Sequence, residues 1–256
     1  MTFIRYDIQT GEILAQIQCD PSNLDTLETD GTGFLEGNVD AQSYWVDEGE
    51  FKEREAVTIA SPTVPTMPSE SPVSVLEGLP SGAAVRVRGT NNMPCETQIV
   101  APEGGTLSIV PNIVGRYVAQ LVGRYTGPEI SFEVQPVEVV KARRQDEVTA
   151  KKAEQLAGGF LWNGKRWDAD AQAQQNVTSM ASAVAAGMEL PDGFFWTSYD
   201  NEDVKIDAAG ISALSAAMMT FIFSTHAHAR SLKEAIEAQD TNAAVMNVDI
   251  DSDWPS

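Results

Sequence analysis

The sequence predicts a multidomain protein with an all-β N-terminal half, made of a small β module and an immunoglobulin-like β-sandwich, followed by an α-helical C-terminal domain with one β-hairpin. Three observations support this fold class. Up to about residue 138, apolar and polar residues alternate in short runs, as in strands with one buried face. From residue 139 the apolar residues recur at helical spacing. A proline-rich stretch at residues 59–72 separates the two β parts.

Composition narrows the possible partners. With 256 residues, of which 43% are hydrophobic, the chain can bury substantial cores in a few small domains. Its formal net charge of −20 repels phosphate groups and anionic membrane surfaces, so we expect no nucleic acid partner. The most apolar window, Ile211 to Phe223, is interrupted by Ser and Thr and is too short to span a bilayer, so we expect no membrane insertion. The first residues lack the basic and apolar regions of a signal peptide.

The first two segments are a β module and a spacer. Residues 1–58 contain short alternating runs broken by Gly, Asp and Pro, which is typical of a small antiparallel sheet. In residues 59–72, Pro62, Pro65 and Pro68 recur every three residues, which places them on one edge of a polyproline II helix. We therefore expect a stiff spacer after the module.

Residues 73–138 return to the two-residue period of strands, with turn signals between the runs. Short strands at this regular spacing favour a sandwich of the immunoglobulin type, although the characteristic Cys and Trp of true immunoglobulin domains are missing. The only cysteines, Cys19 and Cys95, fall in different predicted modules, so we expect no disulfide and no Cys-based zinc site.

The predicted helical domain covers residues 139–240. A first helix at about 140–157 ends at a Gly-Gly pair, and a second begins after Asp168, which we expect to cap it. Asp207 is expected to cap a third helix that runs to about Ala238. Residues 241–256 are acidic and contain no basic residue, and we expect a solvated tail there.

The hairpin at residues 160–167 is predicted by the segment FLWNGKRWDAD, since Asn-Gly is the strongest signal for a two-residue type I′ turn. This register places Phe160, Trp162 and Trp167 on one face. Such a face serves either as cover for a small core or as a platform on which a glycan stacks. We expect the core role, in which the three rings hold the hairpin against the second and third helices.

The search for catalytic and metal-binding motifs is negative. His226 and His228 are the only histidines, and two residues apart on a helix they point in different directions, so we expect no shared metal. The sequence has no nucleophile elbow, no Gly-rich phosphate loop and no Cys with a plausible His partner. Among 37 acidic residues, some pair of carboxylates will lie close together in any fold, so such a pair indicates nothing specific. We expect no enzymatic activity and no cofactor.

Two parts of the chain resemble bacteriophage proteins. Residues 141–240, with RRQDEVTAKKAEQLAGG, the aromatic hairpin, FFWTSYDNEDVKIDAAGISAL and a long last helix ending in HARSLKEAIEA, resemble a helical domain of uncharacterised function found at the ends of tail-fibre and other virion proteins. The N-terminal residues, from YDIQTGEILAQIQC to GNVDAQSYWVDEGEFKERE, are similar to a small module at the start of phage tail proteins.

These resemblances imply a structural component of a bacteriophage virion, synthesised in the host cytoplasm and located in the phage tail. A short tail fibre or a tail-tip or baseplate connector is expected, with a role in host attachment and with other phage tail proteins as partners. The family supplies no catalytic residues. The alternative is a receptor-binding adhesin that recognises a bacterial surface glycan through the sandwich or through Trp162 and Trp167.

The third helix carries a heptad stripe of apolar residues that can pack within the chain or against neighbouring chains. A second face of alanines allows another helix to approach closely, and the phage fibres that this chain resembles are commonly threefold. We therefore expect a homotrimer with Met218 and Phe221 near its axis and His228 as a buried polar position. The candidate interface residues are Ile211, Leu214, Met218, Phe221 and His228.

Overall fold

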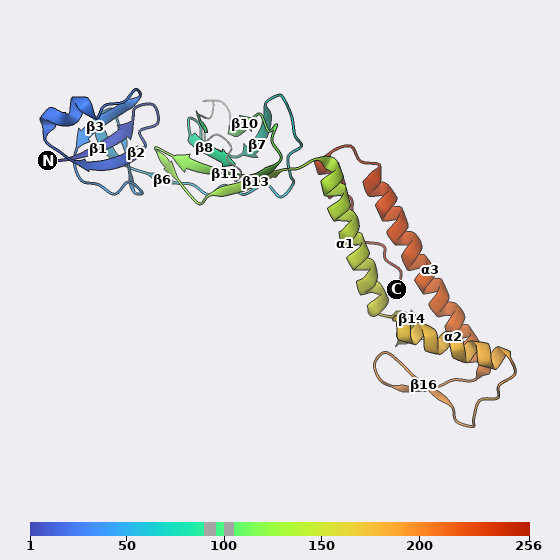
Figure 1. The fold of residues 1–256 in the computed structure, drawn as a ribbon. Coiled ribbons are helices and arrows are strands. Elements are labelled where there is room, and N and C mark those ends of the chain that lie inside the picture. The colour runs from blue at the N-terminus through green and yellow to red at the C-terminus, as the bar shows by residue number, and fades with distance from the viewer. Residues whose placement is uncertain (90–95, 100–104) are drawn as a thin grey trace. The chain divides into compact units, whose positions relative to one another are not determined.

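The computed structural model describes residues 1–89, 96–99 and 105–256, and divides into two compact units, Met1–Pro136 and Val137–Ser256. The first unit is all β and the second is mainly helical, which confirms the predicted fold class (Figure 1). The boundary between the units lies within three residues of residue 139, where the spacing of apolar residues changes from that of strands to that of helices. Pro136 immediately precedes the first helix. Cys95 lies outside the described residues, and Cys19 is a free thiol.

The N-terminal module consists of a three-stranded sheet of order β2-β1-β3 and a two-stranded hairpin, β4–β5. Both neighbours of the central strand are antiparallel to it. A small core of Ile4, Ile13 and Val46 lies beneath the sheet. The elements are β1 (Thr2–Asp7), β2 (Ile13–Gln18), the short 3-10 helix η1 (Pro21–Thr26), β3 (Thr32–Glu36), β4 (Tyr44–Asp47) and β5 (Glu50–Glu53).

The second part of the β unit is a sandwich whose buried residues come from two sheets, one of order β13-β11-β8-β9 and one formed by β10 and β7. Alternate residues point into the core, as the sequence pattern predicts; along β11 these include Tyr117, Ala119 and Leu121. The strands are β6 (Glu55–Ala56), β7 (Val73–Glu77), β8 (Ala84–Gly89), β9 (Glu96–Ile99), β10 (Thr106–Ile109), β11 (Gly115–Val122), β12 (Tyr125–Thr126) and β13 (Ile130–Val134).

One contact in the sandwich is typical of the immunoglobulin type. The Tyr117 hydroxyl donates a hydrogen bond to the backbone oxygen of Ile113, four residues earlier, over 2.8 Å. Its ring stacks on Phe132 with 5.2 Å between centroids. A tyrosine that closes a corner in this way recurs in such sandwiches. Burial raises the pKa of the Tyr117 hydroxyl, which keeps it protonated as a donor.

The Pro-rich segment 59–72, which was predicted to be a stiff spacer, packs against the sandwich. The Thr66 amide donates to Glu133 O over 2.8 Å, and the Gln135 amide donates to Thr66 O over 2.9 Å. Pro65 is buried, and Ile59 packs against the sandwich core. Proline cannot donate to a ladder, but the non-proline residue between two prolines can, so an extended segment of this composition still adds to the edge of a sheet.

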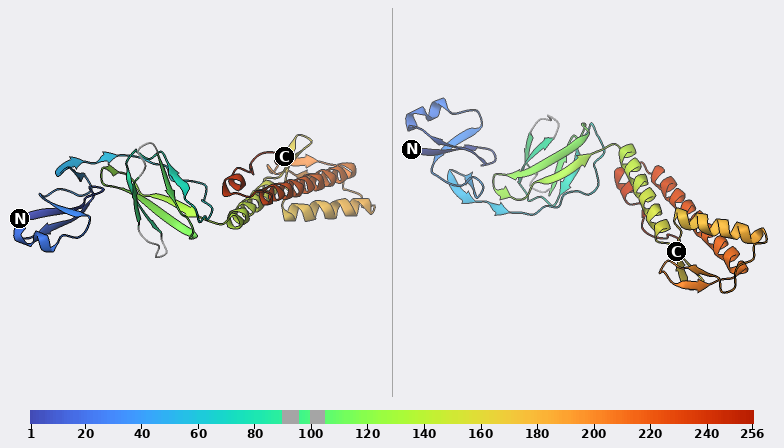
Figure 2. Two further views of the ribbon diagram at one scale, coloured as in Figure 1. Left: turned by 90° about the horizontal axis from the view of Figure 1, so that it is seen from above. Right: turned by 60° about the horizontal axis from the view of Figure 1, so that its bottom comes forward.

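The helical unit is organised around two long helices, α1 and α3, which pack side by side (Figure 1). α2 packs on the N-terminal half of α3, where Val177 joins the same core cluster as Leu214 and Met218 (Figure 2). Two hairpins complete the unit. The elements are α1 (Val137–Ala157), β14 (Phe160–Trp162), β15 (Lys165–Trp167), α2 (Ala171–Ala185), β16 (Phe195–Thr197), β17 (Asp203–Lys205), α3 (Ala208–Glu237) and α4 (Asn242–Met246).

Residues 241–256 belong to this unit, which corrects both the expected solvated tail and the domain boundary at residue 240. Val245 and Ile250 are buried in a cluster with Val140 and Val148 of α1. Trp254 packs on the same cluster, and its indole N–H donates to Ile250 O over 2.8 Å. The acidic side chains of this segment stay in solvent while its few apolar residues enter the core, so overall acidity concealed a segment that packs.

Candidate functional site

The aromatic hairpin has the predicted register, with Phe160 opposite Trp167 and Trp162 opposite Lys165. Asn163 and Gly164 at its tip have φ angles of 53° and 76°, as a type I′ turn requires. The phenyl ring of Phe160 stacks on Phe221 of α3 with 5.5 Å between centroids. The hairpin is therefore held against α3 by an aromatic pair, in addition to the area that it buries.

The two tryptophans have different surroundings. Trp167 is only 2% exposed, and its indole N–H donates to the Trp162 carbonyl over 3.0 Å. Trp162 is half-buried and meets Trp167 edge-on, with 5.9 Å between ring centroids. The prediction that the rings hold the hairpin against the second and third helices is confirmed for Phe160 and Trp167. Trp162 contacts the same core, but part of its ring faces a cleft.

The cleft beside Trp162 has a volume of about 890 Å³ and is open to solvent. Its walls come from the hairpin tip, the connection between α2 and β16, strand β17 and the first turn of α3. Aromatic and aliphatic side chains alternate with carboxylates, an amide and two lysines. The lining side chains that matter for binding are Trp162, Asn163, Lys165, Glu189, Asp192, Phe194, Lys205 and Asp207.

Phe194 and strand β17 of the β16–β17 hairpin supply the far side of this cleft, and this hairpin was not predicted from the sequence. Trp196 lies opposite Val204 in its ladder, and both side chains pack on the aromatic core. Lys165 of the first hairpin forms an ion pair with Glu202 in the β16–β17 turn, and this partner raises the pKa of the lysine. The positive φ of Asn201, 59°, marks the turn, and an Asp-Asn pair between two apolar runs is the signal that would have predicted it.

A second cavity, of about 470 Å³, lies between α2 and the β16 strand on the other side of Trp167. Asp168 and Asp170 both line it. Partial burial, followed by the negative charge of Asp170, raises the pKa of the Asp168 carboxyl. Asp170 accepts a hydrogen bond from the Ala173 amide over 2.8 Å and is the N-cap of α2, which corrects the prediction that Asp168 caps this helix. Ala169 between them is buried in the aromatic core, and the helix begins after Asp170.

The heptad stripe of α3 packs inside the unit. Ile211, Leu214, Met218 and Phe221 are at most 5% exposed within the single chain. Asp207 caps this helix as predicted, accepting from the Gly210 amide over 2.7 Å. A homotrimer stays a prediction, and within the single chain the four side chains of the stripe are already covered.

His228 lies under the C-terminal segment. Its ring meets Trp254 edge-on at 4.8 Å, and its buried Nε2 has no hydrogen-bond partner among the described residues. His226 is exposed on a different side of α3. The residues that the structure describes contain no group of three or more side chains suited to hold a metal ion.

From the sequence, the apolar window Ile211 to Phe223 is too short to span a bilayer. The whole helix α3, however, has the length and composition of a membrane-spanning helix. Among the described helices it alone is long enough and apolar enough to cross a bilayer. Core helices of soluble proteins share these properties, and the stripe of α3 contributes to two of the core clusters of the unit.

Two short motifs in the N-terminal segments that resemble phage tail proteins meet in space: Tyr-Asp-x-x-Thr-Gly at residues 6–11 and Tyr-x-Val-Asp at residues 44–47. In the Tyr-Asp-x-x-Thr-Gly motif, Asp7 accepts hydrogen bonds from the Thr10 amide and hydroxyl over 2.8 and 2.9 Å. Gly11 then turns the chain with φ of 69°, and its carbonyl accepts from the amide of Val46 in the Tyr-x-Val-Asp motif over 2.9 Å. A Cβ at Gly11 would lie 2.2 Å from Val46 O, so only glycine fits there.

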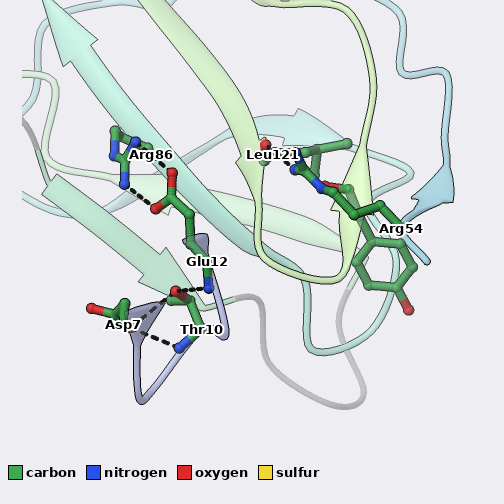
Figure 3. A network of polar contacts seen from close by, with 7 residues as sticks. Asp7, Thr10, Glu12, Arg54, Arg86 and Leu121 are labelled. Carbon is green, nitrogen blue, oxygen red and sulfur yellow. Dashed lines mark hydrogen bonds and ion pairs between the residues drawn. The ribbon is translucent and has the colours of Figure 1, made fainter. Parts of the chain in front are cut away.

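The residue after this turn connects the module to the sandwich. Glu12 pairs with Arg86 of β8, with 2.9 Å between Nη1 and Oε1, and both side chains are mostly buried (Figure 3). Nearby, the Arg54 guanidinium donates to the carbonyl oxygens of Leu121 and Tyr125 (Figure 3). Burial of Arg54 lowers its pKa, although the guanidinium stays charged at neutral pH. These contacts give the charged and small residues of the motifs a structural role, and no catalytic role is needed to account for them.

Comparison with known proteins identifies only the C-terminal part of the chain. Residues 139–252 match the family model described as a domain of unknown function, DUF4376. The match confirms the expectation that a domain of uncharacterised function occupies this part, and it extends into the segment that we had expected to be a tail. No curated protein and no solved structure matches the chain.

Proposed function

We propose that the protein is a structural component of a bacteriophage virion, acting as a short tail fibre or as a connector at the tail tip or baseplate. It would be synthesised in the host cytoplasm and act in the assembled particle beside other tail proteins. The resemblance of residues 141–240 and of the N-terminal motifs to phage proteins supports this role. One observation supports this role most directly: the motif residues have structural tasks. Asp7, Thr10 and Gly11 form a turn, and Glu12 connects the module to the sandwich through Arg86.

A protein of the particle needs stable modules and surfaces for its neighbours. The motif residues of the N-terminal module are committed to packing and to the junction with the sandwich, as expected for a docking module. The exposed face of that module then remains for contact with the tail. Its acidic side chains favour a basic partner surface, because the chain carries −20 net charge.

Peptide mass spectrometry of phage particles tests this role. Particles purified by density gradient should contain this chain at a fixed ratio to the major capsid protein. A non-structural protein expressed at the same time in infection is the control, and it should be lost during purification. Absence of the chain from intact, infectious particles would refute the proposal.

A second function, binding of a bacterial surface glycan, is favoured by the cleft beside Trp162. The half-buried ring can stack on the apolar face of a sugar, and Glu189, Asp192 and Asn163 offer groups that bond to hydroxyls. The volume of the cleft lies within the range of small-molecule binding sites, about 300–1,000 Å³. Trp167 cannot take part as first envisaged, because its ring is enclosed in the core.

Titration of the full chain with oligosaccharides from host surface polysaccharides, followed by calorimetry, tests glycan binding. Trp162→Ala should abolish binding, whereas Leu161→Ala, at an exposed position on the neighbouring residue, should leave it unchanged. The circular dichroism spectrum of Trp162→Ala must match that of the wild type for the comparison to hold. No binding to any host saccharide, or equal loss in both variants, would exclude this function.

A further inference from the structure

We infer that α3 binds a second copy of the same chain through its outer face, in antiparallel orientation. This inference does not depend on the virion role. The outer face is the side of α3 turned away from the core, and each of its members is exposed. Phe223 is 75% exposed, and the neighbouring Met219 is 53% exposed. The outer face consists of Ala209, Ala213, Ala216, Thr220, Phe223 and Ala227.

Phe223 and Met219 are neighbours on α3 and are flanked by small residues, so the exposed apolar surface is contiguous, and a contiguous apolar patch marks an interaction site. The opposite side of α3 already packs in the core clusters of the unit. The outer face is therefore not needed for folding of the unit, and its apolar character requires a partner.

Charge identifies the partner as a second copy. Asp, Glu, Lys and Arg are absent from α3 between Asp207 and Arg230, and also from α2 and its following turn, residues 171–188. Two copies of a chain with −20 net charge repel each other over most of their surface, so they can approach only where the surface is uncharged. An anionic bilayer is repelled as well, and the outer face lacks the Lys, Arg and Trp residues that anchor a helix at a membrane surface.

The spacing of the outer face makes it self-complementary. Ala209, Ala216 and Phe223 are seven residues apart, as are Ala213, Thr220 and Ala227, which is the repeat of a coiled coil. In an antiparallel pair centred between Ala216 and Thr220, the Phe223 ring of one copy lies opposite Ala213 of the other. Ala227 then lies opposite Ala209. Each large side chain meets a small one, twice, about a single twofold axis.

The ends of the helices support the same orientation. The antiparallel pair brings Arg230 of one copy to the level of Asp207 at the N-terminus of the other helix. Antiparallel helices also place the positive end of one macrodipole beside the negative end of the other, which is favourable. In a parallel pair, Phe223 would meet Phe223 and like charges would lie side by side.

The size of the outer face predicts a reversible dimer. The uncharged stretch of α3 is about 33 Å long at 1.5 Å per residue, and a helix face is roughly 10 Å wide. Two such faces bury about 700 Å², which is below the roughly 1,200 Å² of standard stable interfaces. We therefore expect association at high concentration, as when many copies are held together in an assembly, and dissociation on dilution.

Sedimentation velocity of the full chain over a dilution series tests the inference. The mass should rise from 27.6 kDa toward about twice that value as concentration increases. Phe223→Glu should remain monomeric at every concentration, while Leu161→Glu, at a position 58% exposed on the hairpin, should associate like the wild type. A wild-type chain that is monomeric throughout, or a Phe223→Glu variant that still associates, would overturn it.

Disulfide trapping tests the orientation. In a background without the native Cys19 and Cys95, a chain with both Ala209→Cys and Ala227→Cys should form a covalent dimer on mild oxidation. Either substitution alone should not, because position 209 of one copy lies opposite position 227 of the other. Efficient trapping by a single substitution would show parallel packing and refute the antiparallel pair, as would a limiting mass of three chains. Phe223-dependent pelleting with phosphatidylcholine and phosphatidylglycerol vesicles, without dimers, would assign the face to lipid instead.

Discussion

Replacement of Trp167 by alanine should cause the largest loss of stability among the hairpin substitutions. The indole is 2% exposed, packs in the cluster with Val177, Leu214 and Phe221, and donates its N–H to the Trp162 carbonyl. Alanine removes the ring, leaves a cavity at the junction of the hairpin with α2 and α3, and leaves that carbonyl without its donor.

The loss of stability is estimated from the area that the Trp167 side chain buries and from its hydrogen bond to the Trp162 carbonyl. A tryptophan buries about 200 Å², which at about 25 cal/mol per Å² gives an upper value near 5 kcal/mol. Buried Trp→Ala substitutions cost about 3–5 kcal/mol in practice. For a domain of this size, about 4 °C of Tm corresponds to each kcal/mol, so the Tm of the helical unit should fall by about 12–20 °C. Trp162→Ala, from a half-buried position, should cost about half as much.

Thermal unfolding followed by circular dichroism at the helical minimum measures these differences. The matched control is Leu161→Ala, because Leu161 is 58% exposed on β14 of the same hairpin and should change stability by no more than about 0.5 kcal/mol. If Trp167→Ala melted within a few degrees of the wild type, the ring would not be part of the core, and the hairpin would have to be reinterpreted as a binding platform.

Three further outcomes follow. The pKa of the partly buried Asp168 carboxyl is raised, so the folded state holds this proton more tightly than the unfolded chain, and stability decreases as pH rises through the folded pKa. Asp168→Asn should therefore stabilise the protein at pH 7 by less than about 1 kcal/mol. Urea titrations should show that this gain vanishes below about pH 4. A double-mutant cycle of Glu12→Ala and Arg86→Ala should give a coupling energy of about 1–2 kcal/mol, because both partners are mostly buried, whereas removal of the exposed Arg88 should cost about 0.5 kcal/mol or less; no coupling would contradict the proposed junction. Trp254→Ala should cost about 1–3 kcal/mol and increase hydrogen exchange in the C-terminal segment, and unchanged exchange would mean that the segment is not held by this ring.

Much of the fold could be predicted because its signals are local. The Asn163-Gly164 pair determines the hairpin register on its own, since few other dipeptides tolerate positive φ at both positions. Asp207 precedes an uninterrupted helical pattern and caps it as expected. Asp168 and Asp170 are equally good caps in sequence, and the structure uses Asp170, with Ala169 between them buried in the core.

The errors occurred where tertiary packing determines the outcome. Residues 59–72 have the composition of a linker, but their backbone still carries donors, and the edge of β13 offers them acceptors. In residues 241–256, Val245, Ile250 and Trp254 are too widely spaced to form a recognisable period, yet together they cover the gap between α1 and α3. The cleft was missed because its walls come from three stretches of sequence, residues 162–167, 188–194 and 204–210, and only the hairpin and the start of α3 had been predicted.

The distribution of charge in the helical unit separates two uses of an apolar helix. A helix that only completes a core needs one apolar stripe, and its solvent side normally carries charged residues that keep it soluble. α1 follows this rule, with Arg, Lys, Glu and Asp over its exposed positions. α3 does not, because charge is absent from both of its sides between Asp207 and Arg230, although only one side is needed for the core. In a chain with 37 acidic residues, an uncharged exposed face that includes Phe223 reduces solubility without improving folding, and contact with a second surface is the physical role that accounts for it.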